Sequence, residues 1–132
     1  MSTVLVVRHA GIWLAMNDTF WQKYPAGKRN KFKDDGGHWL ARNPIASASP
    51  GAPPELADMT IPRFIESGGI VLACNLALKG VTALIKEEDR VSESEADSLA
   101  KKFMIPGIIL QPSGVFAALH AQELGCHYIL AS

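Results

Sequence analysis

The stretch GIVLACNLALKGV at residues 69–81 does most to define the fold class. Its residues 70–73 are apolar at every position, which is typical of a strand buried on both faces of a parallel sheet. The chain then runs directly into residues 75–85, which we expect to form a helix. Three other short runs share this apolar character, so the predicted strands cover residues 4–7, 70–73, 108–110 and 128–131.

Helix signals fill the segments between these strands. Thr60 can cap a helix in which Pro62 is an early residue, and the sequence SESE at 92–95 is a capping box. Alternating strands and helices predict a single α/β domain with right-handed crossovers over residues 1–132. The predicted helices cover residues 11–24, 60–67, 75–85, 96–103 and 115–124.

Residues 25–59 interrupt this pattern. A stretch of this length without strong helix or strand signals is typically a lid, a partner-binding loop or a disordered segment. The apolar Trp39, Leu40 and Ile45 argue against a simple linker. We expect this insertion to lie beyond the end of the first strand, where it would cap the candidate site or build an interface.

Composition excludes several classes of function. The 132 residues include 13 Lys and Arg against 13 Asp and Glu, so no excess of positive charge is available to bind nucleic acid. No apolar run approaches the roughly 20 residues that span a bilayer. Cys74 and Cys126 are too few for a disulfide framework, and no His and Cys residues have a metal-ligand spacing. The sequence therefore predicts a cytoplasmic protein without a membrane segment, metal or cofactor.

Candidate site residues follow the predicted strands, because ligands of open parallel sheets collect at the carboxyl ends of strands. Cys74 is the strongest candidate, since a thiol at a helix N-terminus is favoured as the reactive thiolate. The alternative is a structural Cys74, because free cysteine is often buried as a small apolar residue. Asn75 follows Cys74 at the same strand end.

The other two strands contribute weaker candidates. His9 ends the first strand and could hydrogen-bond in the same cleft, or be satisfied by backbone groups alone. Its neighbour Arg8 is expected on the opposite face, because side chains alternate along a strand. Ser113 and Gly114 could offer backbone N–H groups to an anion, although an ordinary helix cap is the more common role.

Three segments carry a family resemblance: the cysteine segment at 69–81, IPGIILQPSGV at 105–115 and AQELGCHY at 121–128. They resemble the DsrE/DsrF/TusD-like proteins, and the resemblance covers residues 61–132 well. It implies a flavodoxin-like three-layer α/β domain with a mainly parallel sheet of four to five strands, assembled as homotrimers or hexamers. It also implies that Cys74 accepts sulfur as a persulfide and passes it between a donor and an acceptor protein, without a cofactor.

The front of the chain, VVRHAGIWLAMNDTFWQKY at 6–24, resembles a subgroup of bacterial members with an export signal and a long insertion. This leaves the periplasm as an alternative location. The family has a strand-helix unit before this segment, so we expect the first unit to be missing here.

Two functional hypotheses follow, with a third that is weaker. The first is a sulfur carrier in which Cys74 holds the persulfide and His9, Asn75, Ser113 and Gly114 bind or orient it. The second is a non-catalytic ligand-binding or assembly module with a structural Cys74. The third is a metal or redox sensor that uses Cys74 with a histidine.

Overall fold

The computed structural model describes residues 3–47, 53–123 and 125. Within them the chain is an α/β domain whose parallel sheet has the order β1-β2-β3. The strands are β1 (Val4–Val7), β2 (Ile70–Cys74) and β3 (Ile109–Gln111). This confirms the predicted class and three predicted strands. A sheet of four to five strands was expected, but the described residues form three, and the strand predicted at 128–131 lies outside them.

The register of the sheet sorts its side chains onto two faces. Val7 pairs with Ala73, and Cys74 pairs with Gln111. Because side chains alternate along a strand, Val71 and Ala73 share one face, while Leu72 and Cys74 share the other. Val7, Val71 and Ala73 belong to the main hydrophobic core. Cys74 therefore faces away from that core.

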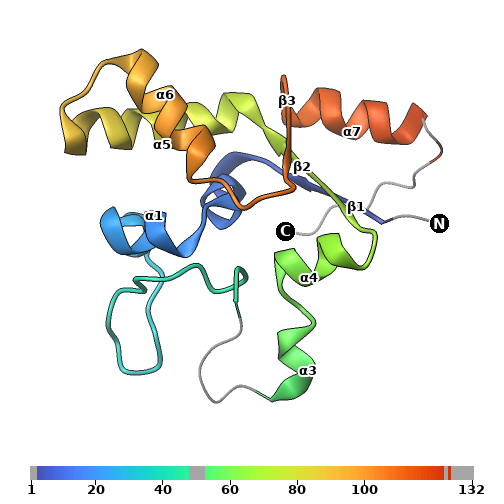
Figure 1. Cartoon of the computed structure of the whole chain (residues 1–132), viewed down its shortest axis with the longest axis horizontal. Coiled ribbons are helices and arrows are strands. Elements are labelled where there is room, and N and C mark those ends of the chain that lie inside the picture. The colour runs from blue at the N-terminus through green and yellow to red at the C-terminus, as the bar shows by residue number, and fades with distance from the viewer. Residues whose placement is uncertain (1–2, 48–52, 124, 126–132) are drawn as a thin grey trace.

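Helices cover both faces of the sheet, which gives three layers (Figure 1). The core face is covered by η1 (His9–Ala15), α1 (Asp18–Lys23), α4 (Ile61–Glu66), α5 (Asn75–Asp89) and α6 (Glu93–Lys102), all of which contribute to the main core. The opposite face is covered by α7 (Gly114–Glu123), which contacts all three strands. Thr60 and Ser92 cap α4 and α6 through hydrogen bonds from Arg63 N and Glu95 N, as the sequence predicts.

The single helix predicted over residues 11–24 is wrong. The structure instead has the 3-10 helix η1 and the separate helix α1, divided at Met16 and Asn17. Asn17 caps α1 by accepting a hydrogen bond from Phe20 N at 2.9 Å, while its own N–H donates to Phe103 O at 2.8 Å. Met16 is extended and forms an isolated bridge with Met104. These contacts with a distant segment satisfy backbone groups that a continuous helix would use internally.

The 25–59 insertion contains local structure. It holds the short helices α2 (Ala26–Arg29) and α3 (Pro54–Ala57) and an antiparallel bridge between Lys33 and Trp39. Its main anchor is Asn43, whose side chain is fully buried and donates to the carbonyls of Leu14 and Met16 at 2.7 and 2.6 Å. The insertion is thus fixed against the η1–α1 junction.

Tyr24 links the end of α1 to the end of α5. Its hydroxyl donates to the Asp89 carboxylate, and its ring is buried against Phe20 and Phe103. Burial, and then the hydrogen bond to Asp89, raise the pKa of Tyr24 well above its ordinary value. The neutral phenol is therefore the form that the folded protein stabilises.

This raised pKa predicts a specific loss of stability in alkali. An unfolded tyrosine loses its proton near pH 10, whereas folded Tyr24 retains it. Above about pH 10 the unfolded state binds fewer protons than the native state, so the free energy of unfolding falls as the pH rises. Urea unfolding between pH 8 and 11 should show a steeper fall for the wild type than for Tyr24→Phe. If the free energy of unfolding fell equally with pH in the two proteins, the raised pKa of Tyr24 would be contradicted.

Candidate functional site

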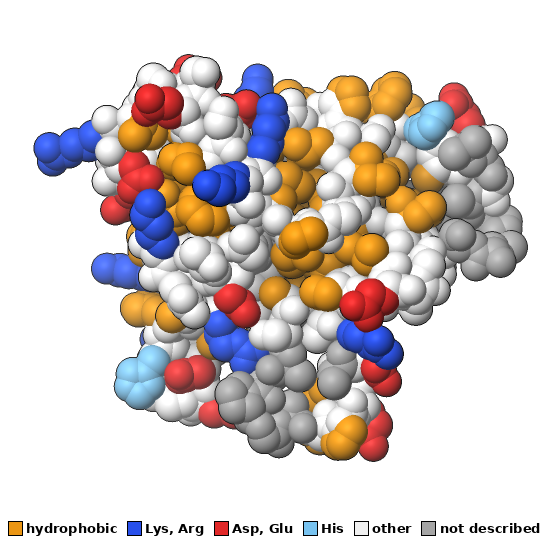
Figure 2. Space-filling model, in the orientation of Figure 1, with side chains coloured by type: hydrophobic (Ala, Val, Ile, Leu, Met, Phe, Trp, Pro, Cys, Tyr) orange, Lys and Arg blue, Asp and Glu red, His pale blue; other side chains and the backbone are white. Residues whose placement is uncertain are grey.

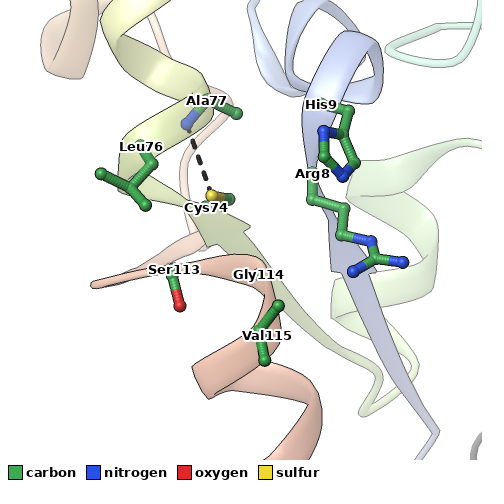
Figure 3. Close-up of a pocket in the computed structure, with 8 residues that line it drawn as sticks. All are labelled: Arg8, His9, Cys74, Leu76, Ala77, Ser113, Gly114 and Val115. Carbon is green, nitrogen blue, oxygen red and sulfur yellow. Dashed lines mark hydrogen bonds between the residues drawn. The ribbon is translucent and has the colours of Figure 1, made fainter.

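A pocket of about 250 Å³ lies where the three strands end. Helix α5 leaves β2 on the core face, whereas α7 leaves the neighbouring β3 on the opposite face. Adjacent strands whose helices diverge in this way leave a crevice at their carboxyl ends, which is the usual ligand position in open α/β sheets. Figure 3 shows the residues that line it, which are Arg8, His9, Cys74, Leu76, Ala77, Ser113, Gly114 and Val115.

Cys74 lies at the junction between β2 and α5. It is the last residue of the strand and the N-cap of the helix, and its Sγ accepts a hydrogen bond from Ala77 N at 3.4 Å (Figure 3). Its thiol is free, and the residue is 6% exposed. The 15-residue helix α5 directs its N-terminal N–H groups toward this end of the strand. The Cys74 sulfur therefore lies at the positive end of the α5 dipole.

Ser113 and Gly114 form the turn from β3 into α7. The Ser113 hydroxyl accepts a hydrogen bond from Phe116 N at 3.0 Å, so it caps α7, and Figure 3 shows it directed away from Cys74. Gly114 packs directly against Arg8. A Cβ atom at Gly114 would lie 2.7 Å from the Arg8 Cβ and 2.8 Å from its Cδ. The absence of a side chain at residue 114 thus allows α7 to approach the end of β1.

Replacing two glycines tests this close approach. We expect Gly114→Ala to destabilise the protein by about 1–3 kcal/mol, because the new methyl group overlaps with Arg8. Gly80→Ala is the matched control, since residue 80 lies within α5 and a Cβ atom there meets open space. Removing a glycine from a helix interior should stabilise by roughly 0.5–1 kcal/mol. If urea unfolding gave Gly114→Ala a higher free energy of unfolding than the wild type, the packing argument would be refuted.

Arg8 and His9 form the wall of the pocket opposite Cys74 (Figure 3). The expectation that Arg8 would lie on the other face is wrong, because β1 ends at Val7 and strand alternation no longer applies. His9 begins η1 with a φ of 50°, a left-handed conformation that is uncommon for a residue other than glycine. This sharp turn keeps both residues beside the pocket.

Two expected neighbours of Cys74 do not line the pocket in the part of the chain that the structure describes. Asn75 is the first residue of α5 and is half-buried, but it is not among the residues that line the pocket. In the described parts of the 25–59 insertion, no residue lines the pocket either, so the insertion does not cap Cys74 here. The lining also includes three residues that were not predicted from sequence, Leu76, Ala77 and Val115. All three lie in the first turn of a helix that follows a strand, and this position in the sequence could have identified them.

The described residues hold neither a metal-ligand cluster nor a helix that could span a membrane. No group of three or more His, Cys, Asp or Glu side chains within residues 3–47 and 53–123 is placed to hold a metal ion. No helix in the described part of the chain combines the length and apolar composition needed to cross a bilayer. Comparison of the chain with family models, curated proteins and solved structures gave no match.

Proposed function

We propose that this protein is a sulfur carrier of the DsrE/DsrF/TusD-like type, in which Cys74 holds sulfane sulfur as a persulfide. The observation that carries the proposal is the position of Cys74, a free thiol at a helix N-terminus that lines a pocket at the end of a parallel sheet. The N–H groups of α5 would stabilise the anionic persulfide that the proposal places on Cys74. The three observed layers also fit a flavodoxin-like domain whose sheet extends to four or five strands.

The loading step is a thiol exchange. The Cys74 thiolate attacks a sulfane sulfur of an inorganic polysulfide and forms a new S–S bond. The S–S bond of the donor breaks, and the shortened polysulfide leaves with the electron pair of that bond. The product is a Cys74 persulfide, and the step needs no added oxidant or reductant. A second thiol then removes the outer sulfur and regenerates the Cys74 thiolate.

Other residues that line the pocket support this role, because they offer hydrogen-bond donors and leave room for the outer sulfur. His9 and the backbone N–H groups at Ser113 and Gly114 would orient the charged outer sulfur within the pocket of about 250 Å³. Persulfide exchange with partner thiols suits a reducing compartment, so we place the protein in the cytoplasm. The resemblance also implies a homotrimer or homohexamer, and we include this assembly in the proposal. An unpaired edge at β1, in the sheet that the described residues form, is compatible with self-association.

A structural Cys74 is the second candidate. Its exposure of 6% and the hydrogen bond from Ala77 N are what a thiol that only caps α5 would show. In that case the pocket would bind a small ligand without sulfur chemistry. A structural thiol reacts with iodoacetamide only after unfolding, whereas a carrier thiol reacts in the native protein.

Intact-mass spectrometry tests the proposal. Cys126→Ser removes the second thiol, and the reduced protein is then exposed to polysulfide under native conditions. We expect a mass gain of one or more sulfur atoms that dithiothreitol reverses. The absence of a gain, together with a thiol that iodoacetamide reaches only in urea, would establish the structural candidate instead.

A further inference from the structure

The part of the 25–59 insertion that extends away from the sheet is a short hairpin, residues 32–40, which we call the insertion hairpin (Figure 1). Its two arms are joined by the Lys33–Trp39 bridge and, on either side of it, by backbone hydrogen bonds of 3.0 and 2.8 Å. Figure 2 shows charged side chains at the end of the molecule where Figure 1 places this hairpin, whereas hydrophobic side chains gather over α7 and β3. Residues 32–39 are all exposed, so a partner can reach them.

The insertion hairpin is fixed at its base. Phe32 N donates to Gly27 O at 2.8 Å, and a Cβ atom at Gly27 would overlap with Leu40 O, so these backbone segments are in close contact. The centroid of the Phe32 ring lies 6.0 Å from that of Trp21, which is buried in the core. Asn43 anchors the chain just after the hairpin. A surface held in this way loses little conformational entropy when a partner binds.

The insertion hairpin has two faces, because side chains alternate along its arms. Phe32 and Leu40 share the face that packs toward the core, while Lys33 and Trp39 share the outward face. The Lys33 Nζ lies 4.6 Å from the centroid of the Trp39 ring, and Trp39 is 43% exposed. The outward face therefore presents a cation beside an accessible aromatic ring.

Positive charge is concentrated next to this outward face. Four of the six residues of the basic segment 28–33, KRNKFK, are Lys or Arg. Among the described residues, no carboxylate lies within ion-pair distance of these four side chains. Asp34 lies on the opposite face from Lys33, where its Oδ1 accepts a hydrogen bond from His38 N at 2.9 Å. Because the whole chain has 13 basic and 13 acidic residues, the segment is a local excess of positive charge.

The charge and the ring together favour an acidic polypeptide over other anionic partners. A positive patch attracts an anionic partner and speeds its association, and tryptophan is enriched among the residues that dominate protein interfaces. Nucleic acid fits less well, because Asp34 and Asp35 follow the basic segment directly and the chain has no net positive charge. An anionic membrane also fits less well. Membrane-binding surfaces bury several apolar side chains, whereas Trp39 is the only large apolar side chain on the outward face of residues 32–40.

We propose that the outward face of the insertion hairpin, together with the basic segment 28–33, docks an acidic polypeptide segment in which an apolar side chain is flanked by carboxylates. The carboxylates pair with Lys31 and Lys33, and the apolar side chain packs on the accessible part of the Trp39 ring. Exposed ion pairs contribute little each, so several carboxylates and the ring contact have to act together. The inference goes beyond the proposed function, because the hairpin lines no part of the Cys74 pocket and binding needs no persulfide.

The experiment measures, by fluorescence anisotropy, the binding of a fluorescein-labelled ten-residue peptide in which glutamates flank leucine. A matched peptide has glutamine in place of glutamate. Lys31→Gln/Lys33→Gln removes charge from the surface, and Trp39→Ala removes the ring. The matched controls are Lys79→Gln/Lys86→Gln, two exposed lysines of α5, and Met59→Ala, an exposed apolar side chain outside the hairpin. Circular dichroism verifies that all variants remain folded.

At about 20 mM salt, we expect the glutamate peptide to bind at least about tenfold more tightly than the glutamine peptide, and this advantage should shrink at about 200 mM salt. Lys31→Gln/Lys33→Gln and Trp39→Ala should each weaken binding of the glutamate peptide at least about fivefold. Both control variants should bind it as the wild type does.

Three results would overturn the inference. The first is equal affinity for the glutamate and glutamine peptides. The second is tighter binding of a ten-nucleotide oligothymidylate, which would assign the surface to nucleic acid. The third is self-association of the protein that Lys31→Gln/Lys33→Gln abolishes, because the surface would then belong to a second copy. A Cys74 that cannot be loaded with sulfur would refute the proposed function and leave this inference intact.

Discussion

Cys74→Ser is expected to abolish sulfur loading completely while the protein stays folded. Serine is close to cysteine in size, and its hydroxyl is a preferred N-cap that can accept the hydrogen bond from Ala77 N. Helix α5 should therefore keep its start, and the free energy of unfolding should change by no more than about 1 kcal/mol. The hydroxyl does not form a persulfide, so intact mass after polysulfide should show no sulfur gain that depends on residue 74.

The matched variant for this prediction is Cys126→Ser, which should load as well as the wild type. If Cys126→Ser lost the sulfur gain and Cys74→Ser kept it, the site assignment would be wrong. If Cys74→Ser unfolded, the cap that serine keeps would be insufficient, and the thiol itself would be required for folding. Cys74→Ala, which lacks both the thiol and the cap, should then unfold as well.

Asn43→Leu is expected to have the largest effect on stability. Its side chain is fully buried, donates to Leu14 O and Met16 O, and accepts from Ile45 N at 3.0 Å. Leucine has a similar volume but leaves these backbone groups without their partner. Each unsatisfied buried group costs about 1–3 kcal/mol, so we expect a loss of about 3 kcal/mol or more. This is a large fraction of the roughly 5–15 kcal/mol that stabilises a typical domain.

Asn30→Ala provides the comparison for Asn43→Leu. Asn30 belongs to the same insertion, but its side chain makes one hydrogen bond, to Ala26 O at 2.9 Å, and is half-buried. Its loss should cost about 1 kcal/mol. Urea unfolding of both variants measures the difference. Equal losses would show that Asn43 does not anchor the insertion.

The strands could be predicted from sequence because their signal is local. Residues 70–73 are apolar at each position, and the structure places β2 between two parallel neighbours. The break between η1 and α1 could not be predicted in the same way. Apolar spacing continues through Met16, and the groups that divide the helix, Phe103 O and Met104, lie far along the chain. A local pattern carries no information about such partners.

The contacts that fix the 25–59 insertion could not be predicted from a local sequence pattern either. A buried asparagine has no periodic signature, and the partners of Asn43 come from η1 and from the segment that precedes α1. The close fit of Gly27 is equally hidden, because a Cβ atom there would lie 2.1 Å from Leu40 O. Only folding brings these two segments together.

The candidate site was predictable in part. The rule that ligands bind at strand ends identified Cys74, His9, Ser113 and Gly114, and the structure brings all four to one pocket. Asn75 was included because it follows Cys74, yet it is not among the residues that line the pocket. Strand alternation misplaced Arg8 because β1 ends one residue earlier. Adjacency in sequence therefore predicted the region of the site better than the direction of each side chain.

Peptide-level mass spectrometry of the native wild-type protein, treated with polysulfide and blocked with iodoacetamide before digestion, tests the central claim most directly. The account predicts an alkylated persulfide on the peptide that contains Cys74, and its loss when dithiothreitol precedes the blocking step. An unmodified Cys74, with added sulfur found only on the peptide that contains Cys126, would contradict it.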